Sequence, residues 1–228
     1  MSRARGKVAL VTGGSRRIGA AISRALAKAG YEVVLTYRAS AREGKSLAAK
    51  IGGSAVPLDL GRPSTFGRFA ARLDRKFGRL DLLVHNAAVF PRMPVDEATT
   101  AAWDAVFAVN LRGPFLLTRA LLPLLRKGRG PAVLFLGDAN AFELWTGYLP
   151  YCLSKLAVPR LAAGLRKALS PGVRVGVVRP GLVLPPDRFP AKRWDRLRAE
   201  KAGRRGIRTP EGVARAVLRF AGAGSYNS

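Results

Sequence analysis

The chain begins with a strand, a glycine turn and a helix in immediate succession. The strand is the apolar, β-branched run 7–12, the turn runs from Gly13 to Gly19, and the helical pattern that follows stops at Gly30. Free amide N–H groups at the start of such a helix, together with the helix dipole, bind the pyrophosphate of a dinucleotide. The start of the sequence therefore predicts a nucleotide-binding unit.

Strand and helix patterns then alternate along the chain. Strands are predicted at 7–12, 32–37, 54–58, 81–85, 132–137 and 173–178, and helices at 18–29, 41–51, 64–77, 101–126, 151–169 and 210–221. This alternation is typical of a parallel sheet with helices on both faces. We therefore expect an α/β fold: a single domain over residues 1–228 with one doubly wound Rossmann-type sheet, whose ligand binds at the carboxyl ends of the strands.

The end of the second predicted strand indicates which dinucleotide is bound. Sites that prefer NAD place a carboxylate there, on the ribose 2′-hydroxyl. This sequence has no acidic residue between Thr36 and Arg42, and Arg38 and Ser40 occupy the position instead. Because a guanidinium and a hydroxyl can bind a 2′-phosphate, the predicted cofactor is NADPH.

Tyr151 and Lys155 are four residues apart in a predicted helix, so their side chains share one face. A nearby ammonium group lowers the free-energy cost of a phenolate, and we expect Tyr151 to exchange a proton near neutral pH. The same spacing also occurs by chance on ordinary solvated helix faces. Combined with a dinucleotide site, it predicts a proton donor beside a hydride donor.

At this point the chain resembles the short-chain dehydrogenase/reductase family, from about Lys7 to about Phe220. The family motifs appear in order: the glycine turn from Thr12 to Gly19, Asp59, Asn86-Ala87, Asn110, Tyr151 with Lys155, and Pro180-Gly181. The resemblance implies catalytic roles for Tyr151, Lys155, Asp138 and Asn110, with Asn110 linked to Lys155 through water or backbone. It implies cofactor binding by Gly13, Ser15, Arg16, Arg17, Ile18, Gly19, Tyr37, Arg38, Ser40, Asp59, Leu60, Asn86, Ala87, Tyr151, Lys155, Pro180, Gly181 and Val183.

Two departures from the common family pattern indicate a narrower branch. Most members have Gly at the position of Arg17 and Ser at the position of Asp138, thirteen residues before the tyrosine. Both replacements, with Tyr37-Arg38 and His85-Asn86-Ala87, resemble the pteridine reductases and dihydromonapterin reductases. A carboxylate suits an aminopyrimidine edge or a protonated ring nitrogen better than a carbonyl oxygen.

The resemblance implies a pterin site formed by Arg17, Phe90, Asp138 and Tyr151. Phe90 would stack on the pterin ring opposite the nicotinamide; the alternative is an ordinary buried aromatic residue. For Asp138 the alternative is a turn cap at the end of a strand. In the expected reaction NADPH gives hydride to a pterin ring carbon of dihydromonapterin, dihydrobiopterin or dihydrofolate, and Tyr151 gives a proton to the adjacent nitrogen.

Two alternative functions remain open at this point. One is a general carbonyl reductase, such as a 3-oxoacyl thioester reductase, although Asp138 replaces the Ser that it would need. The other is an inactive, basic relative that binds nucleic acid. The formal net charge of +26, from 40 Lys and Arg against 14 Asp and Glu, raises non-specific affinity for nucleic acid. The basic residues are spread along the chain without interleaved aromatic residues, so we expect no specific nucleic-acid partner.

One basic run follows Pro180-Gly181, where the resemblance implies a mobile lid over the substrate. This segment, about 184–209, contains Arg188, Lys192, Arg193, Arg196, Arg198, Lys201, Arg204, Arg205 and Arg208. Beyond the last predicted helix, relatives continue into a further strand, whereas this sequence ends at Ser228. We therefore expect a missing last strand with an unpaired sheet edge, for which truncation is one explanation. The resemblance also implies a homo-oligomer, either a dimer or a tetramer.

The single cysteine and the single histidine indicate the cellular compartment and limit thiol and metal chemistry. Cys152 is the only cysteine, so no intramolecular disulfide can form, and we expect a cytoplasmic enzyme. Without a histidine partner, Cys152 is interpreted as a small buried side chain. His85, the only histidine, is expected to line the cofactor site, and no metal site is expected. We expect no membrane-spanning segment and no secretory signal.

Overall fold

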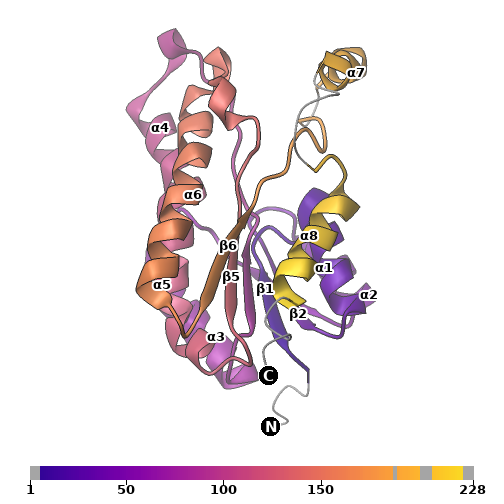
Figure 1. Cartoon of the computed structure of the whole chain (residues 1–228), viewed down its shortest axis with the longest axis vertical. Coiled ribbons are helices and arrows are strands. Elements are labelled where there is room, and N and C mark those ends of the chain that lie inside the picture. Colours follow the sequence, from indigo (N-terminus) through magenta and orange to yellow (C-terminus); the bar gives the residue numbers. More distant parts are fainter. Residues whose placement is uncertain (1–5, 187–188, 201–206, 223–228) are drawn as a thin grey trace.

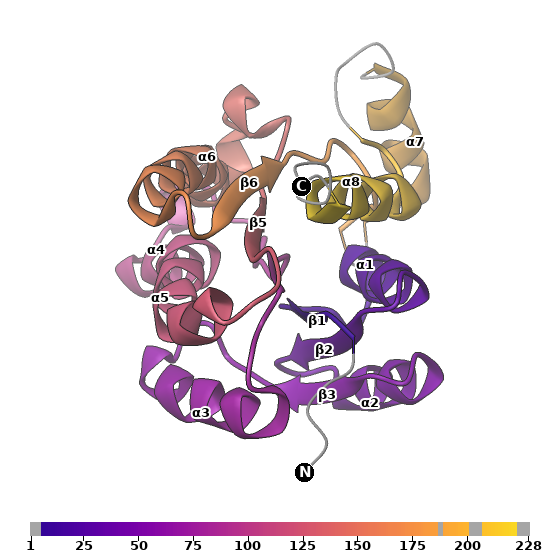
Figure 2. The ribbon, with the colours of Figure 1, turned by 60° about the horizontal axis from the view of Figure 1, so that its bottom comes forward.

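Six parallel strands form one sheet in the order β3-β2-β1-β4-β5-β6 (Figures 1 and 2). The computed structural model describes residues 6–186, 189–200 and 207–222. The strands are β1 (Val8–Val11), β2 (Glu32–Tyr37), β3 (Ser54–Pro57), β4 (Leu82–His85), β5 (Ala132–Leu136) and β6 (Arg174–Val178). Each lies within about two residues of its predicted position, because the apolar runs that mark the strands are also the parts that become buried.

Helices cover both faces of the sheet (Figure 2). One face carries α1 (Arg17–Lys28), α2 (Ala41–Lys50) and α8 (Pro210–Gly222), and the other carries α3 (Phe66–Phe77), α4 (Thr100–Phe107), α5 (Gly113–Arg126) and α6 (Leu149–Leu169). A π-helical turn, Ala108–Arg112, joins α4 to α5, and short 3₁₀ segments lie at Pro63–Thr65, Val95–Glu97, Ala141–Glu143 and Thr146–Tyr148. The doubly wound α/β fold expected from the sequence is confirmed.

The core consists of two layers of apolar side chains, one on each face of the sheet. Leu10, Leu83 and Phe135 belong to the layer under α3, α5 and α6, and Val11 and Leu134 belong to the layer under α1 and α8. Successive side chains of a strand point to opposite faces. A strand covered on both sides must therefore be apolar throughout, and β1, β4 and β5 are buried at every position.

The helical run Thr100–Arg126 is long and apolar enough, by length and composition, to cross a membrane. Core helices of folded domains share this property. In this fold, Leu117, Leu121 and Leu125 are fully buried against the sheet, which accounts for the high hydropathy of the run. A single long helix was predicted here, and the π-helical turn that interrupts it was not.

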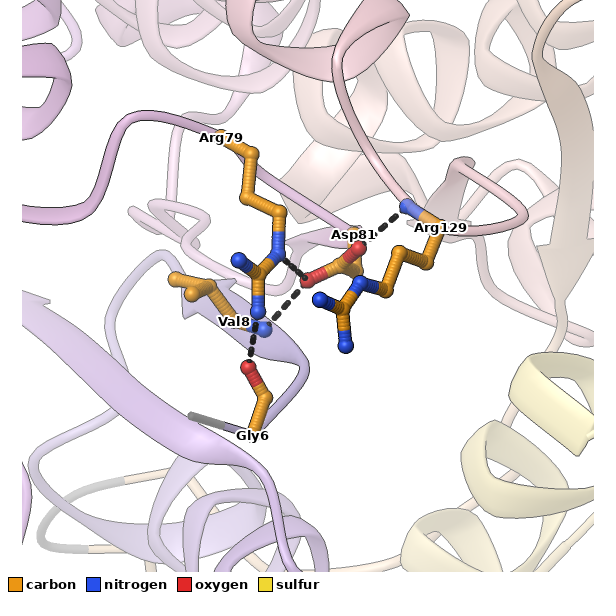
Figure 3. Close-up of polar contacts among 5 residues, drawn as sticks. All are labelled: Gly6, Val8, Arg79, Asp81 and Arg129. Atoms are coloured by element: carbon orange, nitrogen blue, oxygen red, sulfur yellow. Dashed lines mark hydrogen bonds and ion pairs between the residues drawn. The ribbon is translucent and has the colours of Figure 1, made fainter. Parts of the chain in front are cut away.

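A buried carboxylate at the amino ends of the strands was not singled out by the sequence analysis (Figure 3). Asp81 accepts hydrogen bonds from the Val8 amide at 2.6 Å, from Arg79 Nε at 3.2 Å and from the Arg129 amide. The Arg79 guanidinium also donates to the Gly6 carbonyl oxygen. Asp81 therefore joins the start of β1, the start of β4 and the turn before β5 at the end of the sheet opposite to the predicted ligand site.

Beyond β6 the chain crosses toward the predicted lid. Within the described residues β6 lies at the sheet edge, hydrogen-bonded to β5, as expected from the sequence. Pro180 forms one parallel bridge with Ile207. The segment predicted as a lid contains a helix that was not predicted, α7 (Ala191–Glu200), which extends away from the sheet (Figure 1). Four of the basic residues assigned to the lid lie outside the described residues: Arg188, Lys201, Arg204 and Arg205.

Candidate active site

The glycine turn after β1 is held against the end of β4. Thr12 Oγ1 accepts hydrogen bonds from the Asn86 amide at 3.0 Å and the Ala87 amide at 3.1 Å. Asn86 Nδ2 donates to the carbonyl oxygens of Thr12 and Gly13 at 2.9 and 3.0 Å. A Cβ atom on Gly19 would lie 2.1 Å from the Gly13 carbonyl oxygen, so only glycine fits there. The start of α1 is thus brought close to the turn.

Arg17 occupies the first position of α1 with a left-handed backbone, at φ 54. A non-glycine residue in this region typically costs about 1–2 kcal/mol, which explains why glycine suits the position. The Arg17 guanidinium donates to the Pro185 carbonyl oxygen in the segment after β6. The Arg16 side chain makes no capping hydrogen bond at the start of α1, and first-turn amides of a helix are the groups that bind an anion.

The end of β2 lies beside the glycine turn. Ser15 Oγ and Ser40 Oγ are 2.5 Å apart, which brings the two predicted phosphate-binding segments together. Arg38 is exposed at this edge. Tyr37 is buried, with its ring against Gly44 of α2, so its contribution is to hold the backbone from which Arg38 projects.

The remaining predicted cofactor residues lie at the carboxyl ends of the strands. Asp59 Oδ1 accepts a hydrogen bond from the Gly61 amide at 2.8 Å, and Leu60 is buried. The Pro180 carbonyl oxygen accepts from Ala139 at 2.8 Å, and the Gly181 amide donates to Ile207 at 2.9 Å. The other members of the set are Ile18, which packs against the α1/α8 layer, and Val183, which is buried in it.

Tyr151 and Asp138 form the central polar contact of the site. The Tyr151 hydroxyl donates to Asp138 Oδ2 at 2.8 Å, and the Asn140 amide donates to Asp138 Oδ1 at 2.8 Å. Burial raises the pKa of Asp138, and burial with the adjacent carboxylate raises the pKa of Tyr151 well above its ordinary value. The expectation of proton exchange near neutral pH is therefore wrong for this arrangement, in which Tyr151 is a neutral phenol.

Lys155 contacts the ring of Tyr151 and not its hydroxyl. Its Nζ donates to the Leu136 carbonyl oxygen at 2.8 Å and lies 5.9 Å from the centroid of the Tyr151 ring. Burial lowers the pKa of Lys155 to about 8, while the negative charge of Asp138 acts in the opposite direction. The pair shares a helix face as predicted, but Asp138 is the hydrogen-bond partner of the phenol.

Asn110 lies in the π-helical turn with its side chain buried. It exchanges two hydrogen bonds with the backbone of Val89 and donates a third to Ser154 Oγ. The described contacts of Asn110 therefore reach the residue before Lys155 and not Lys155 itself. A link from Asn110 to Lys155 through water or backbone stays a prediction.

Phe90 belongs to an aromatic cluster that the sequence analysis recognised only in part. Its ring stacks on Tyr148, with centroids 4.3 Å apart and an interplanar angle of 4°. The edge contacts are to Tyr151 at 4.4 Å and to Trp145 at 6.1 Å. Tyr148 thus covers one face of the Phe90 ring, and a stacked ligand would need the other face or a displaced Tyr148. Four aromatic residues between 142 and 151 are the signal that could have revealed this cluster.

His85 does not line the site, contrary to expectation. It is buried, with Nε2 2.8 Å from Thr118 Oγ1 and its ring stacked on Phe135 at 4.7 Å. Burial lowers its pKa to about 3. Cys152 is fully buried, as interpreted from the sequence, and the described residues contain no group of three potential metal ligands.

The strand order, the glycine turn and the Tyr151/Lys155 pair are those of a dinucleotide-dependent oxidoreductase. The family model for short chain dehydrogenases matches residues 7–195, and the chain belongs to this family. The class of cofactor is therefore a nicotinamide dinucleotide, and the class of activity is oxidoreduction of a small molecule.

Several known proteins are similar to this chain. D-threitol dehydrogenase of Mycolicibacterium smegmatis is 32% identical over 205 residues, which cover 86% of this chain and 76% of that protein. Human dehydrogenase/reductase SDR family member 4 is 34% identical over 78% of this chain and 66% of that protein. A crystal structure of a dehydrogenase/reductase from Sinorhizobium meliloti 1021 matches with a TM-score of 0.85 at 34% identity, over 99% of this chain and 92% of the other.

Proposed function

We propose that this protein is an NADPH-dependent reductase of a pterin C=N bond, with dihydromonapterin, dihydrobiopterin or dihydrofolate as substrate. The observation that carries the proposal is the hydrogen bond between Asp138 and Tyr151. A carboxylate in this position can accept hydrogen bonds from an aminopyrimidine and can hold a proton for the ring nitrogen. A carbonyl oxygen needs a donor there, and Asp138 has none in the ionised form that accepts the Tyr151 hydrogen bond.

Three features support NADPH as the cofactor. Gly19 lets the start of α1 pack closely against the Gly13 carbonyl oxygen, and the Arg16 side chain makes no capping hydrogen bond there. Arg38 is an exposed guanidinium at the end of β2, and Ser15 and Ser40 adjoin the turn. These groups would bind the pyrophosphate and the 2′-phosphate. When bound, the cofactor supplies the hydride.

The residues of the site then supply the proton. Tyr151, with its raised pKa, remains protonated and can donate to the substrate nitrogen. Loss of that proton would leave a phenolate beside a carboxylate, and two like charges at this distance repel. The raised pKa of Asp138 allows its carboxyl group to carry the proton that restores the phenol. Lys155, at 5.9 Å from the ring centroid, provides the compensating positive charge.

A second candidate is oxidoreduction of a polyol or a simple carbonyl. It is favoured by the name of the threitol dehydrogenase, which is 32% identical to this chain, and by the stacking of Tyr148 on Phe90, which occupies one face of the expected pterin slot. This candidate uses Tyr151 in the same way but gives Asp138 no role in substrate binding.

The deciding experiment is an NADPH-oxidation assay with a dihydropterin, dihydrofolate, a β-ketoacyl thioester and a simple carbonyl compound in parallel. We expect the two pterin-type substrates to be reduced with the highest kcat/KM. The matched variant Asp138→Ser restores the residue common in the family, and it should depress pterin reduction while leaving NADPH binding unchanged. Preferential reduction of the carbonyl substrates by the wild type would replace the pterin proposal with the second candidate.

The preference for NADPH has its own test. Loss of a charge-assisted contact costs about 1.5–3 kcal/mol, or roughly tenfold or more in affinity. We expect Arg38→Ala to weaken NADPH binding by that factor and to leave NADH binding unchanged. Arg24→Ala, at an exposed position in the middle of α1, is the control for a loss of one positive charge. Equal dissociation constants for NADPH and NADH in the wild type would reject the assignment.

Exposed apolar side chains on three helices support self-association of this chain. Trp103 of α4, Phe115 of α5 and Leu156 of α6 are 38–40% exposed, an apolar set on the helices of one face. Burial of such side chains between copies is favourable, so we propose a homo-oligomer, either a dimer or a tetramer, in the cytoplasm. Light scattering should give a mass of at least twice 24.4 kDa for the wild type. Trp103→Glu should shift it toward the monomer.

A further inference from the structure

Ser154 is a fully buried hydroxyl between the two catalytic positions of α6. Its Oγ donates to the Tyr151 carbonyl oxygen at 2.7 Å and accepts from Asn110 Nδ2 at 3.0 Å. A hydroxyl has one hydrogen to donate, and that hydrogen is used for Tyr151. The hydroxyl therefore has a fixed direction, with Asn110 as donor and the backbone of Tyr151 as acceptor.

Asn110 holds the loop that carries Phe90. Its Oδ1 accepts from the Val89 amide at 2.9 Å, and its Nδ2 donates to the Val89 carbonyl oxygen at 3.0 Å. Residues 86–94 have no regular secondary structure, so these backbone groups depend on a side chain for their partners. An amide group has two N–H donors, and the second one is the hydrogen that reaches Ser154.

The loop 86–94 and helix α6 are also in contact through aromatic rings. Phe90, directly after Val89, lies with its ring 4.4 Å from the Tyr151 ring at an angle of 80°. The polar chain from Val89 through Asn110 to Ser154 thus runs beside the aromatic contact. The loop that carries Phe90 and the helix that carries Tyr151 are therefore joined by two contacts, one polar and one aromatic.

We propose that Ser154 is a positioning residue that sets the place of Phe90 relative to the Tyr151 hydroxyl, acting through Asn110. The proposal rests on the proposed function only in taking Tyr151 as the proton donor and Phe90 as a wall of the substrate site. It assigns Ser154 no contact with substrate or cofactor.

Removal of the Ser154 hydroxyl should disturb Phe90 through Asn110. In Ser154→Ala, one Asn110 N–H is left buried without an acceptor, and a buried unsatisfied donor is costly. A rotation of the amide that relieves it also breaks the paired bonds to Val89, so the disturbance passes to Phe90. Small displacements of reacting groups lower rates by up to about 100-fold. We expect kcat to fall about tenfold, with less than a twofold change in the dissociation constant of NADPH.

A double-mutant cycle separates positioning from a general loss of stability. If Ser154 acts on Phe90, the effect of Phe90→Ala on kcat/KM will be at least threefold smaller in the Ser154→Ala background than in the wild type. Thr118→Val is the matched control. Thr118 is also a buried hydroxyl that donates to a carbonyl in its own helix, that of Pro114 at 2.8 Å. Its effect should combine additively with that of Phe90→Ala.

If Ser154→Ala fails to fold, the near-isosteric variant Ser154→Cys provides a second test. Ser154→Cys retains a weak donor and acceptor in almost the same volume, and kcat should lie between the values of the wild type and the alanine variant. A wild-type kcat in Ser154→Cys together with additive effects in the cycle would overturn the proposal.

Hydrogen exchange of the Val89 amide tests the proposal without any substrate. We expect exchange to accelerate at least tenfold in Ser154→Ala and to stay unchanged in Thr118→Val. If the wild type reduces carbonyl compounds and no pterin, the proposed function fails, and the same cycle is run with the carbonyl substrate. Unchanged protection of Val89 in a folded Ser154 variant would overturn the positioning role whichever substrate is reduced.

Discussion

At the scale of single residues, the hydrogen bond between Tyr151 and Asp138 is the central polar contact of the candidate site. This hydrogen bond of 2.8 Å joins the Tyr151 phenol to the Asp138 carboxyl group. The pKa values of both groups are raised. Desolvation acts on both groups because both lose water on folding. The proton therefore stays on the phenol in this arrangement.

The role of Tyr151 predicts the outcome of removing its hydroxyl. Tyr151→Phe should bind NADPH with unchanged affinity and lose about 100-fold or more in turnover, the usual size of a general-acid contribution. Tyr31→Phe, at the opposite ends of the strands, is the matched control. Steady-state kinetics and cofactor titration measure the two effects. Turnover within threefold of the wild type would remove Tyr151 from the mechanism.

His85 predicts a specific dependence of stability on pH. Its pKa is lowered to about 3 in the folded protein, whereas an unfolded histidine titrates near 6.5. Between these values the unfolded chain binds the proton and the folded protein does not, so stability falls as pH decreases through this window. The slope is about 1.4 kcal/mol per pH unit.

Urea unfolding at pH 7 and pH 5 tests this linkage. Between pH 7 and pH 5, the free energy of unfolding should fall by about 2 kcal/mol more in the wild type than in His85→Gln, because glutamine has no proton to bind. The comparison uses the difference between pH values, so a general destabilisation by the substitution cancels. Identical pH dependence in the two proteins would show that His85 is protonated in the folded state.

At the scale of elements, Asp81 connects parts of the fold that no local pattern joins. Its carboxylate is 3% exposed and accepts from the start of β1, from Arg79 and from the turn before β5 (Figure 3). Removing the carboxylate leaves the Val8 and Arg129 amides without this acceptor and takes the carboxylate partner from the Arg79 guanidinium. Such a loss costs about 3–5 kcal/mol.

We therefore expect Asp81→Ala to lower the free energy of unfolding by about 3 kcal/mol or more. The matched control is Asp74→Ala, which removes an exposed ion pair with Lys127 at 3.1 Å and should cost about 1 kcal/mol or less. Urea unfolding of both variants at pH 7 makes the comparison. Equal losses in the two variants would contradict a structural role for the buried carboxylate.

At the scale of the whole molecule, the net charge of +26 acts on every anionic ligand. Helix α7 adds a local concentration of it, with Lys192, Arg193, Arg196 and Arg198 on ten residues. Exposed charges attract ligands over about 8 Å at physiological ionic strength and over longer distances at low salt. The substrate preference should therefore depend on salt.

The prediction is that dihydrofolate, with its anionic glutamate tail, gains over an unconjugated dihydropterin at low salt. The ratio of their kcat/KM values should shrink as the salt concentration rises. A variant with Lys192→Gln and Arg196→Gln should show a smaller ratio at low salt and a flatter dependence. A ratio that stays constant with salt in the wild type would refute electrostatic attraction by this segment.

The sequence by itself determined the fold, and it proposed the residues of the site. Strand positions, the glycine turn and the Tyr151/Lys155 spacing are local patterns, and alternating strands and helices favour one sheet topology. The same reasoning failed for α7 and for the π-helical turn around Asn110. The apolar pattern of 101–126 predicts one continuous helix. The buried position of Asn110 depends on its hydrogen bonds to Val89 and Ser154, which are distant in sequence.

Only the tertiary structure decided which side chains meet and which lose water. It placed the Tyr151 hydroxyl on Asp138 and Lys155 on the Leu136 carbonyl oxygen. It also buried His85 against Phe135. Hydrogen-bond partners and pKa values depend on distances of a few ångströms between strand ends and on the local loss of solvent. Neither quantity is encoded in the spacing of residues along the chain, so both appear only when the sheet and its helices are assembled.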